Sequence, residues 1–235
     1  MIIVTGHKGQ IGSLLVKRLE EILPNWTIGI DIRDGMNVIS CSLPNDFGIE
    51  CIYHLAAQSS VESSWKDPVH DMDNIRMIAR LVKRYPDIKI IYANSAASID
   101  PKSPYGFSKW ACGEYLKKFH KNWVNCIFPN VYGGSDKSVV DIFKDKDEVT
   151  VFGDGLQTRD YVHVKDIVEG LILAKDWECG DYFMGSGIPT NVLQLAEGKK
   201  INFAPARKEA RESVLINSCP NWKPKIKVLD YIKNL

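Results

Sequence analysis

The sequence predicts an α/β fold in which a doubly wound parallel sheet is followed by a small mixed α/β lobe. Short, continuously apolar segments alternate with segments of helical period over residues 1–128, a pattern typical of parallel strands covered by helices on both faces. Beyond residue 128 the alternation becomes irregular. We therefore expect a sheet domain over residues 1–128 and a smaller lobe over residues 129–235, with an approximate boundary that the chain can cross more than once.

The individual elements follow from changes of hydrophobic period along the chain. Ile2–Thr5 is a β-branched run that ends in Gly6, and a helical pattern of apolar residues then runs from Gln10 to Ile22. Further strands are predicted at 26–30, 51–55, 88–93 and 123–128, with helices around 75–81 and 105–119. In the lobe we expect helices at 139–143 and 164–174 and strands at 149–152 and 182–184.

Composition excludes several classes of protein. The 30 Lys and Arg residues against 29 Asp and Glu give a formal net charge of +1, so no global field would attract nucleic acid or an anionic membrane surface. The six cysteines form no C-x-x-C pair and the histidines show no metal-ligand spacing, so we expect reduced cysteines and no metal site. No stretch approaches the roughly 18 apolar residues of a membrane span, which favours a cytoplasmic protein.

Three glycines, Gly6, Gly9 and Gly12, follow the first predicted strand at intervals of three residues, where the first helix begins. Glycines at these places allow a tight turn, leave the backbone free to approach a pyrophosphate and let the helix pack closely on the sheet. The helix N-terminus in turn attracts phosphate. In this context the triplet favours a Rossmann-type dinucleotide site, and a glycine-rich turn without a ligand is the alternative.

Asp31 ends the second predicted strand, nineteen residues beyond Gly12. A carboxylate at this place can accept hydrogen bonds from the adenosine ribose hydroxyls and repels a 2′-phosphate, which favours NAD over NADP. Arg33, two residues further on, would soften that discrimination. The alternative is that Asp31 only terminates a strand.

A second group of polar residues is placed for acid/base chemistry. Tyr105 and Lys109 lie four residues apart, on one face of a helix predicted to begin just after Pro104. An adjacent ammonium favours the phenolate of a tyrosine, whose ordinary pKa is near ~10. Ser95 follows the fourth strand, at the sheet edge where a nicotinamide would lie. Such a Tyr–Lys pair also occurs by chance on amphipathic helices, and Ser95 could instead make a local turn hydrogen bond.

These motifs occur together in a known family. In chain order they are Gly6-x-x-Gly9-x-x-Gly12, Asp31, His54-Leu55-Ala56-Ala57-Gln58, Asn94-Ser95-Ala96-Ala97, Tyr105-x-x-x-Lys109, Asn130-Val131-Tyr132-Gly133 and Arg159-Asp160-Tyr161-Val162. Taken jointly, they resemble the extended short-chain dehydrogenase/reductase family, and within it the NAD-dependent nucleotide-sugar epimerases and dehydratases of the UDP-glucose 4-epimerase type. The similarity runs nearly end to end.

The resemblance implies NAD as cofactor, a nucleotide-diphosphate sugar as substrate, and a role for each matched residue. Tyr105 would be the acid/base, Lys109 would tune it and bind the nicotinamide ribose, and Ser95 would orient the reacting hydroxyl. The implied cofactor contacts are Gly6, Gly9, Gln10, Ile11, Gly12, Asp31, Ile32, Leu55, Ala56, Ala57, Asn74, Tyr105, Lys109 and Phe128. The implied substrate contacts are Ser95, Asn130, Arg159 and Arg207.

The activity that the resemblance favours is epimerisation of the sugar through a transient keto-sugar, with reversible hydride transfer. A nucleotide-sugar reductase or dehydratase on the same fold is one alternative, and a catalytically idle NAD-binding sensor is another. Dehydratases of the family usually carry a Thr and two acidic residues where this chain has Asn94-Ser95-Ala96, which disfavours dehydration. Arg159 could instead form a surface ion pair, and Arg207 could belong to an exposed charged segment.

The chain departs from the family pattern in length. Residues 31–51, 95–105 and 130–159 are all shorter stretches than in usual members. A short link between Ser95 and Tyr105 removes wall from the active-site cleft, which would admit a bulkier substrate or leave the site wetter. Substrate identity is therefore less well determined than cofactor identity.

The helix that begins at Tyr105 also carries the apolar residues Trp110, Leu116 and Phe119. Family members often pair by packing such helices into a four-helix bundle, so the resemblance implies a homodimer. Burial of the same side chains within one chain is the alternative.

Overall fold

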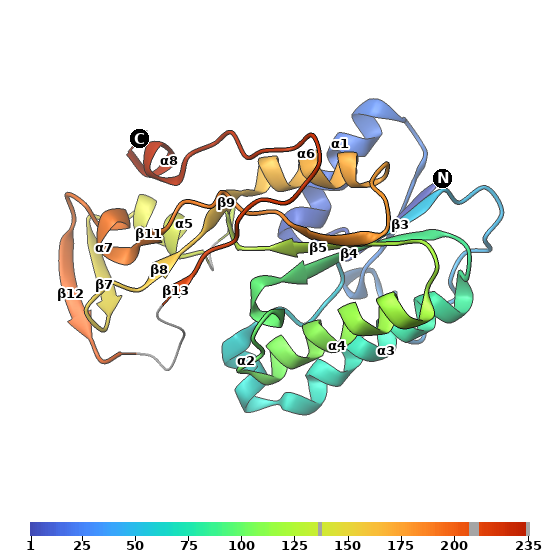
Figure 1. Cartoon of the computed structure of the whole chain (residues 1–235), viewed down its shortest axis with the longest axis horizontal. Coiled ribbons are helices and arrows are strands. Elements are labelled where there is room, and N and C mark those ends of the chain that lie inside the picture. The colour runs from blue at the N-terminus through green and yellow to red at the C-terminus, as the bar shows by residue number, and fades with distance from the viewer. Residues whose placement is uncertain (136–137, 207–211, 234–235) are drawn as a thin grey trace. The chain divides into compact units, whose positions relative to one another are not determined.

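The computed structural model describes residues 1–135, 138–206 and 212–233 (Figure 1). The chain forms two compact units, Met1–Ile127 with Leu171–Tyr182, and Phe128–Gly170 with Phe183–Leu235. Residues 171–182, which the sequence pattern placed in the smaller lobe, belong to the first unit because strand β10 (Gly180–Phe183) lies beside β5 (Trp123–Phe128).

The first unit is built on a sheet whose described strands have the order β10-β5-β4-β3-β1-β2. Strand β1 (Ile2–Thr5) pairs in parallel with both β2 (Thr27–Ile30) and β3 (Cys51–His54), and β3 pairs in parallel with β4 (Lys89–Ser95). Every residue of β1 and β3 is buried. Helices cover both faces of such strands, which explains their mostly apolar sequences. The predicted doubly wound α/β fold is confirmed.

The order of the strands reverses at β1, because β2 lies on one side of it and β3 on the other. At such a point the loops that follow two neighbouring parallel strands diverge and leave a crevice at the carboxyl edge of the sheet. The loop after β1 begins with Gly6 and the loop after β3 begins with Leu55. Two of the predicted cofactor segments therefore start at the same place in the fold.

Helix α1 (Gln10–Ile22) lies on one face of this sheet, and α3 (Pro68–Arg84) and α4 (Pro104–Phe119) lie side by side on the other (Figure 1). Both α3 and α4 begin with a proline that follows a capping residue: the side chains of Asp67 and Ser103 accept hydrogen bonds from backbone N–H groups of the first turn. Because of this cap, α3 begins seven residues before the periodic stretch from which it was predicted. The short helix α2 (Val61–Lys66) precedes it.

The region between β2 and β3 contains only a single short helical turn, η1 (Ile32–Asp34), and adds no strand to the sheet. Helix α3 holds this loop in place through hydrogen bonds from its arginine side chains to the loop backbone. The guanidinium of Arg80 donates to the carbonyl oxygens of Val38 and Cys41, each at 2.6 Å. Arg84 donates to the carbonyl oxygen of Pro44 at 2.9 Å. These bonds satisfy loop carbonyl groups that a strand would otherwise pair.

The outer face of α4 carries exposed aromatic side chains. Trp110 and Phe119 are 43% and 58% exposed, whereas Leu116 is completely buried in the core of the first unit. The sequence had left open whether these three residues are buried within one chain, and only Leu116 is. No helix in the described part of the chain is long and apolar enough to cross a membrane.

The second unit consists of short strands and helices around its own apolar core. Its strands pair as β6 with β9, β7 with β12, and β8 with both β11 and β13. Tyr132, Val151 and Leu195 are among the core residues. The bounds are β6 (Asn130–Tyr132), α5 (Val139–Lys144), β7 (Glu148–Phe152), β8 (Thr158–Arg159), β9 (Tyr161–His163), α6 (Val164–Ala174), β11 (Thr190–Asn191), α7 (Val192–Leu195), β12 (Lys200–Ala204), β13 (Glu212–Ser213) and α8 (Val228–Lys233).

Candidate active site

The glycine turn between β1 and α1 is packed too tightly for any larger residue. Gly6 has φ of +72°, and a Cβ atom there would lie 2.7 Å from the backbone nitrogen of Ala56. A Cβ atom at Gly12 would lie 2.1 Å from the carbonyl oxygen of Gly6. Gly9 is the N-cap of α1, which has no acidic residue in its first turn. The turn therefore combines a bare backbone with the positive end of a helix, as a pyrophosphate site requires.

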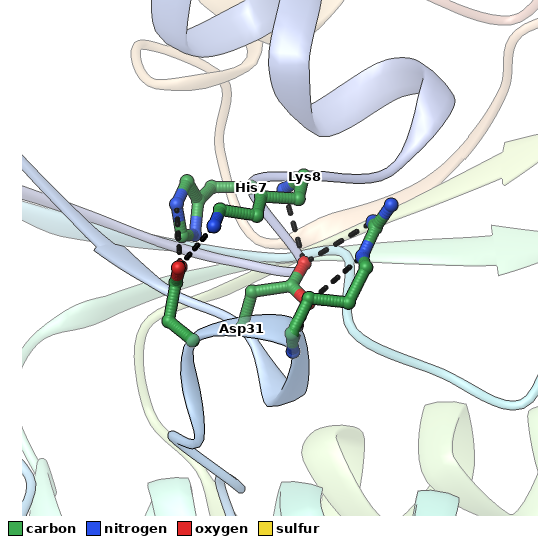
Figure 2. A network of polar contacts seen from close by, with 5 residues as sticks. His7, Lys8 and Asp31 are labelled. Atoms are coloured by element: carbon green, nitrogen blue, oxygen red, sulfur yellow. Dashed lines mark hydrogen bonds and ion pairs between the residues drawn. The ribbon is translucent and has the colours of Figure 1, made fainter.

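Asp31 lies at the end of β2 and is tied to the glycine turn (Figure 2). It is 5% exposed. One carboxylate oxygen accepts a hydrogen bond from the backbone N–H of Lys8 at 3.0 Å, and the other accepts from the backbone N–H and Nε of Arg33 at 2.9 and 3.2 Å. Burial acts to raise the pKa of Asp31, but the bonds from Arg33 and Lys8 outweigh it, so the pKa is lowered. Asp31 is therefore a carboxylate at neutral pH.

A second carboxylate completes the same network. Asp34 forms ion pairs with Lys8 and, at 3.2 Å, with Nε2 of His7 (Figure 2). Both partners of Asp34 belong to the glycine turn, and both acidic residues follow β2. The network thus fixes the turn against the end of β2. The neighbouring Ile32, a predicted cofactor contact, is exposed.

Asn74 holds the loop that follows β3. Its Oδ1 accepts a hydrogen bond from the backbone N–H of Gln58 at 2.9 Å, and its Nδ2 donates to the carbonyl oxygen of Gln58 and, at 3.0 Å, to Oγ of Ser108. The amide is buried and occupied by these bonds. It therefore braces the half-buried segment Leu55–Ala57 and couples it to α4. The sequence motif includes Gln58, but sequence analysis had assigned no role to Gln58 or Ser108.

Ser95, at the end of β4, lies near Tyr105 of α4, and Lys109 follows one turn along the same helix. Tyr105 and Lys109 are 8% and 4% exposed. The Ser95 hydroxyl lies near the phenol of Tyr105, whose pKa it acts to lower, and accepts a hydrogen bond from the backbone N–H of Ala97 at 3.2 Å. The ammonium of Lys109 donates to the carbonyl oxygen of Ala93 at 2.7 Å. The local turn bond considered for Ser95 is thus present together with its contact to the phenol.

The charges around the phenol differ from the sequence-based expectation. Burial raises the pKa of Tyr105, the Ser95 hydroxyl acts to lower it, and the charge of Asp71 raises it further. Burial lowers the pKa of Lys109 to about 8. We had expected the ammonium to favour the phenolate, but Lys109 is bound to a backbone carbonyl and lies over the Tyr92 ring at 4.7 Å. Within the protein, burial outweighs any such effect on Tyr105.

The predicted substrate residues Asn130 and Arg159 belong to the second unit. The backbone N–H of Asn130 donates to the carbonyl oxygen of Asp160, the residue after Arg159, at 3.1 Å, so the two residues lie close together. The guanidinium of Arg159 donates to the carbonyl oxygen of Thr158 at 2.8 Å. Phe128 is buried. Arg207 lies outside the described residues.

Comparison with known proteins identifies the family. The model of the NAD dependent epimerase/dehydratase family matches residues 2–183, and the chain belongs to this family. A putative UDP-glucose 4-epimerase from Methanocaldococcus jannaschii is 30% identical over 100% of this chain and 97% of its own length. Their alignment spans 298 positions against 235 residues. Internal segments of that relative therefore have no counterpart here, in agreement with the short stretches predicted above.

Solved structures show the same fold. UDP-glucose 4-epimerase from Thermotoga maritima, determined with UDP-glucose, is 26% identical, covers 99% of this chain and 96% of its own, and superposes with a TM-score of 0.82. An NAD-dependent NDP-hexosamine 5,6-dehydratase is 20% identical, covers 91% of this chain and 87% of its own, and also has a TM-score of 0.82. Epimerases and dehydratases thus share this architecture, which by itself does not separate the two reactions.

The burial of Lys109 leads to a test of stability. Its folded-state pKa of about 8 lies below the ordinary value of 10.5, so below pH 8 the folded protein holds an ammonium that would be better solvated in the unfolded chain. We expect Lys109→Met to raise the free energy of unfolding by about 1–2 kcal/mol at pH 7, measured by urea denaturation. The gain should shrink as the pH rises from 8 to 10.5, because over this range Lys109 is already neutral in the folded wild type and loses its charge in the unfolded chain.

Lys102→Met provides the control, because Lys102 is exposed and pairs only with Asp100 among the described residues. Its free energy of unfolding should change by less than about 0.5 kcal/mol. A Lys109→Met variant less stable than the wild type at pH 7 would contradict the argument.

Proposed function

We propose that the chain is an NAD-dependent nucleotide-sugar epimerase in which Ser95, Tyr105 and Lys109 form the catalytic group. The observation that supports this proposal is that Ser95 lies near the Tyr105 phenol at the carboxyl edge of the sheet, while Lys109 follows one turn along the same helix and both the phenol and the ammonium are buried. A Tyr–Lys pair that occurs by chance on a helix surface would be exposed and would have no contact with Ser95. Here both side chains are buried despite the free-energy cost of desolvating polar groups. Membership of the family supports the same assignment.

The residues at the crevice fit a dinucleotide. The turn at Gly6 and Gly12 leaves no space for a Cβ atom, so the pyrophosphate would approach the backbone directly and bind N–H groups at the start of α1. The ionised Asp31 would accept hydrogen bonds from the adenosine ribose, and Leu55–Ala57 would line the nicotinamide end. A bound NAD would supply reversible hydride transfer to and from the sugar.

Proton transfer is the task of the chain's own residues. Ser95 would hold the reacting sugar hydroxyl, and Tyr105 would take its proton as the alcohol becomes a ketone and give it back on the return step. The positive charge of an oxidised nicotinamide would oppose the effect of burial on the Tyr105 pKa. Lys109 would donate to the nicotinamide ribose, while its bond to Ala93 holds the ammonium in place.

We propose a nucleotide diphosphate sugar as the substrate class. Asn130 would bind the sugar nucleotide, and Arg159, with Arg207, would bind the diphosphate, because a guanidinium remains charged and can bind phosphate oxygens in pairs. The epimerase from Thermotoga maritima was solved with UDP-glucose, which supports the class. A reductase or dehydratase would differ in net consumption of reduced cofactor or loss of water, and an idle sensor would bind NAD without turnover.

We also propose that a second copy of the chain covers the exposed apolar face of α4. Phe107 and Trp110 contact each other there with tilted rings whose centroids lie 5.6 Å apart, and Phe107 lines a shallow groove with Trp65, Pro68 and Met72. An apolar surface formed by α3 and α4 can pair with its own copy about a twofold axis.

The first prediction concerns that surface. Trp110→Glu should convert a dimer into a monomer, measured as a halved mass by sedimentation equilibrium, because the charge would lie within the proposed interface. Trp26→Glu is the matched control, since Trp26 is 46% exposed, close to the 43% of Trp110, and lies outside α4. An unchanged mass for Trp110→Glu would contradict this pairing.

The second prediction concerns the acid/base. Tyr105→Phe should retain NAD binding but reduce epimerisation of a nucleotide sugar about a thousandfold, because the phenol that moves the proton is gone. Tyr115→Phe on the same helix removes a hydroxyl away from the site and should keep full activity. Epimerisation would be followed by separating the two sugars after the reaction. Undiminished turnover in Tyr105→Phe would remove Tyr105 from the mechanism.

The third prediction concerns cofactor choice. Asp31→Asn should weaken NAD binding about tenfold, or roughly 1.4 kcal/mol, and should weaken NADP binding less, because the carboxylate both binds ribose hydroxyls and repels a 2′-phosphate. Asp34→Asn removes the other carboxylate of the network in Figure 2 and should leave NAD affinity within about twofold. Calorimetric titration of each of the two variants with NAD and with NADP measures these affinities. Equal losses in the two variants would contradict the role of Asp31.

A further inference from the structure

Asp71, in the first turn of α3, is a buried carboxyl group that no role described above explains. Its side chain is 0% exposed, and neither carboxyl oxygen has a hydrogen-bond partner among the described residues. Buried carboxylates are ordinarily paired or hydrogen-bonded, because an uncompensated charge is costly to desolvate. Burial accordingly raises the pKa of Asp71. Such a costly arrangement calls for a functional reason.

The packing of α3 against α4 places Asp71 at the level of Tyr105. Strands β3 and β4 are parallel, so the helices that follow them start at the same edge of the sheet and run in the same direction (Figure 1). The bond from Asn74 to Ser108 fixes their register. Asp71 precedes Asn74 by three residues and Tyr105 precedes Ser108 by three, so both lie one turn back from that bond.

The charged groups around Asp71 do not neutralise it. At the start of α3, the N-cap residue Asp67 raises the pKa of Asp71 and His70 lowers it, and His70 is exposed beside Asp73. On α2, Lys66 is paired with Glu62 at 2.8 Å. On α4, the Lys109 ammonium is bound to the Ala93 carbonyl oxygen, and in the loop before α4 Lys102 is paired with Asp100. The charge of Asp71 in turn raises the pKa of the Tyr105 phenol.

We propose that Asp71 is a positioning residue that sets the pH at which Tyr105 becomes a base, because the carboxyl group and the phenol oppose each other's ionisation. The inference rests on the proposed function, which makes Tyr105 the acid/base. An ionised Asp71 stabilises the protonated phenol, and a phenolate at Tyr105 favours the protonated carboxyl group. The two groups titrate as a coupled pair.

This coupling favours one direction of the chemistry. A phenol that stays protonated to higher pH is present to a larger extent in the proton-donating form that reduction of a keto-sugar requires, and to a smaller extent in the base form that oxidation of an alcohol requires. Asp71 would thus favour return of the keto-sugar to the alcohol over its release. The carboxyl group need not touch the substrate to have this effect, since it acts through the charge on Tyr105.

The test is the pH dependence of Asp71→Asn, which removes the charge while keeping the shape. On the acid side of its pH profile, kcat/KM for nucleotide-sugar epimerisation should rise about three- to tenfold over the wild type, because more of the phenol is ionised. On the alkaline plateau the two proteins should agree. Asp73→Asn is the matched control, because Asp73 carries the same charge two residues away but is paired with Arg76 at 2.8 Å on the surface. Its profile should match the wild type.

A second measurement does not depend on turnover. The ionisation of Tyr105 is followed in the NAD-loaded protein as the difference in ultraviolet absorbance between each chain and the same chain carrying Tyr105→Phe. Asp71→Asn should move this titration to lower pH. If that variant folds poorly, Asp71→Ala provides a second test and should move the titration in the same direction. A shifted titration with no epimerisation in any chain would contradict the proposed function but support the coupling. Epimerisation with an unshifted titration and profile would overturn the coupling.

Discussion

The burial of the Lys109 ammonium against the Ala93 carbonyl is the interaction on which the candidate site depends. It joins α4 to the end of β4 at 2.7 Å, and this approach is possible because α4 presents glycines to its neighbours. A Cβ atom at Gly106 would lie 2.5 Å from the Ala97 carbonyl oxygen, and one at Gly113 would lie 3.1 Å from Nδ2 of Asn94. The helix therefore lies close enough for Tyr105 to reach Ser95. The same closeness removes water, which raises the pKa of the phenol and lowers that of the ammonium.

Close packing also fixes the glycine turn against the loop that follows β3. There the backbone of Gly6 contacts the backbone of Ala56, and Asn74 holds the following residues of that loop through Gln58. Since Asn74 also donates to Ser108 of α4, the proposed cofactor loop and the proposed catalytic helix share one buried amide. Displacement of α4 would therefore disturb both. This link explains why the amide of Asn74, which the resemblance implied as a cofactor contact, makes its hydrogen bonds within the protein.

The fold was largely predictable from the sequence because the central strands are buried on both faces and therefore apolar throughout. The pattern failed where burial is partial: Gly180–Phe183 contains no fully buried residue, and its place beside β5 depends on a partner more than fifty residues earlier. The motif residues of the site were predictable because their spacing follows from strand, turn and helix geometry. Asp71 was not, because an acidic residue in the first turn of a helix ordinarily indicates a solvated N-terminus.

The shortened chain keeps this arrangement by replacing long loops with local hydrogen bonds. Between Ser95 and Tyr105 the backbone forms one helical turn, η2 (Ala96–Ser98), in which Ser98 donates to the Ser95 carbonyl oxygen at 2.7 Å, and the cap at Ser103 then starts α4. Each end of the link is thus held by its own side chain. Because the three proposed catalytic groups are placed by β4, α4 and these short bonds, removing outer loop length need not disturb them. What the missing segments can alter is the extent of the surface offered to a substrate, which is where members of one fold acquire different specificities.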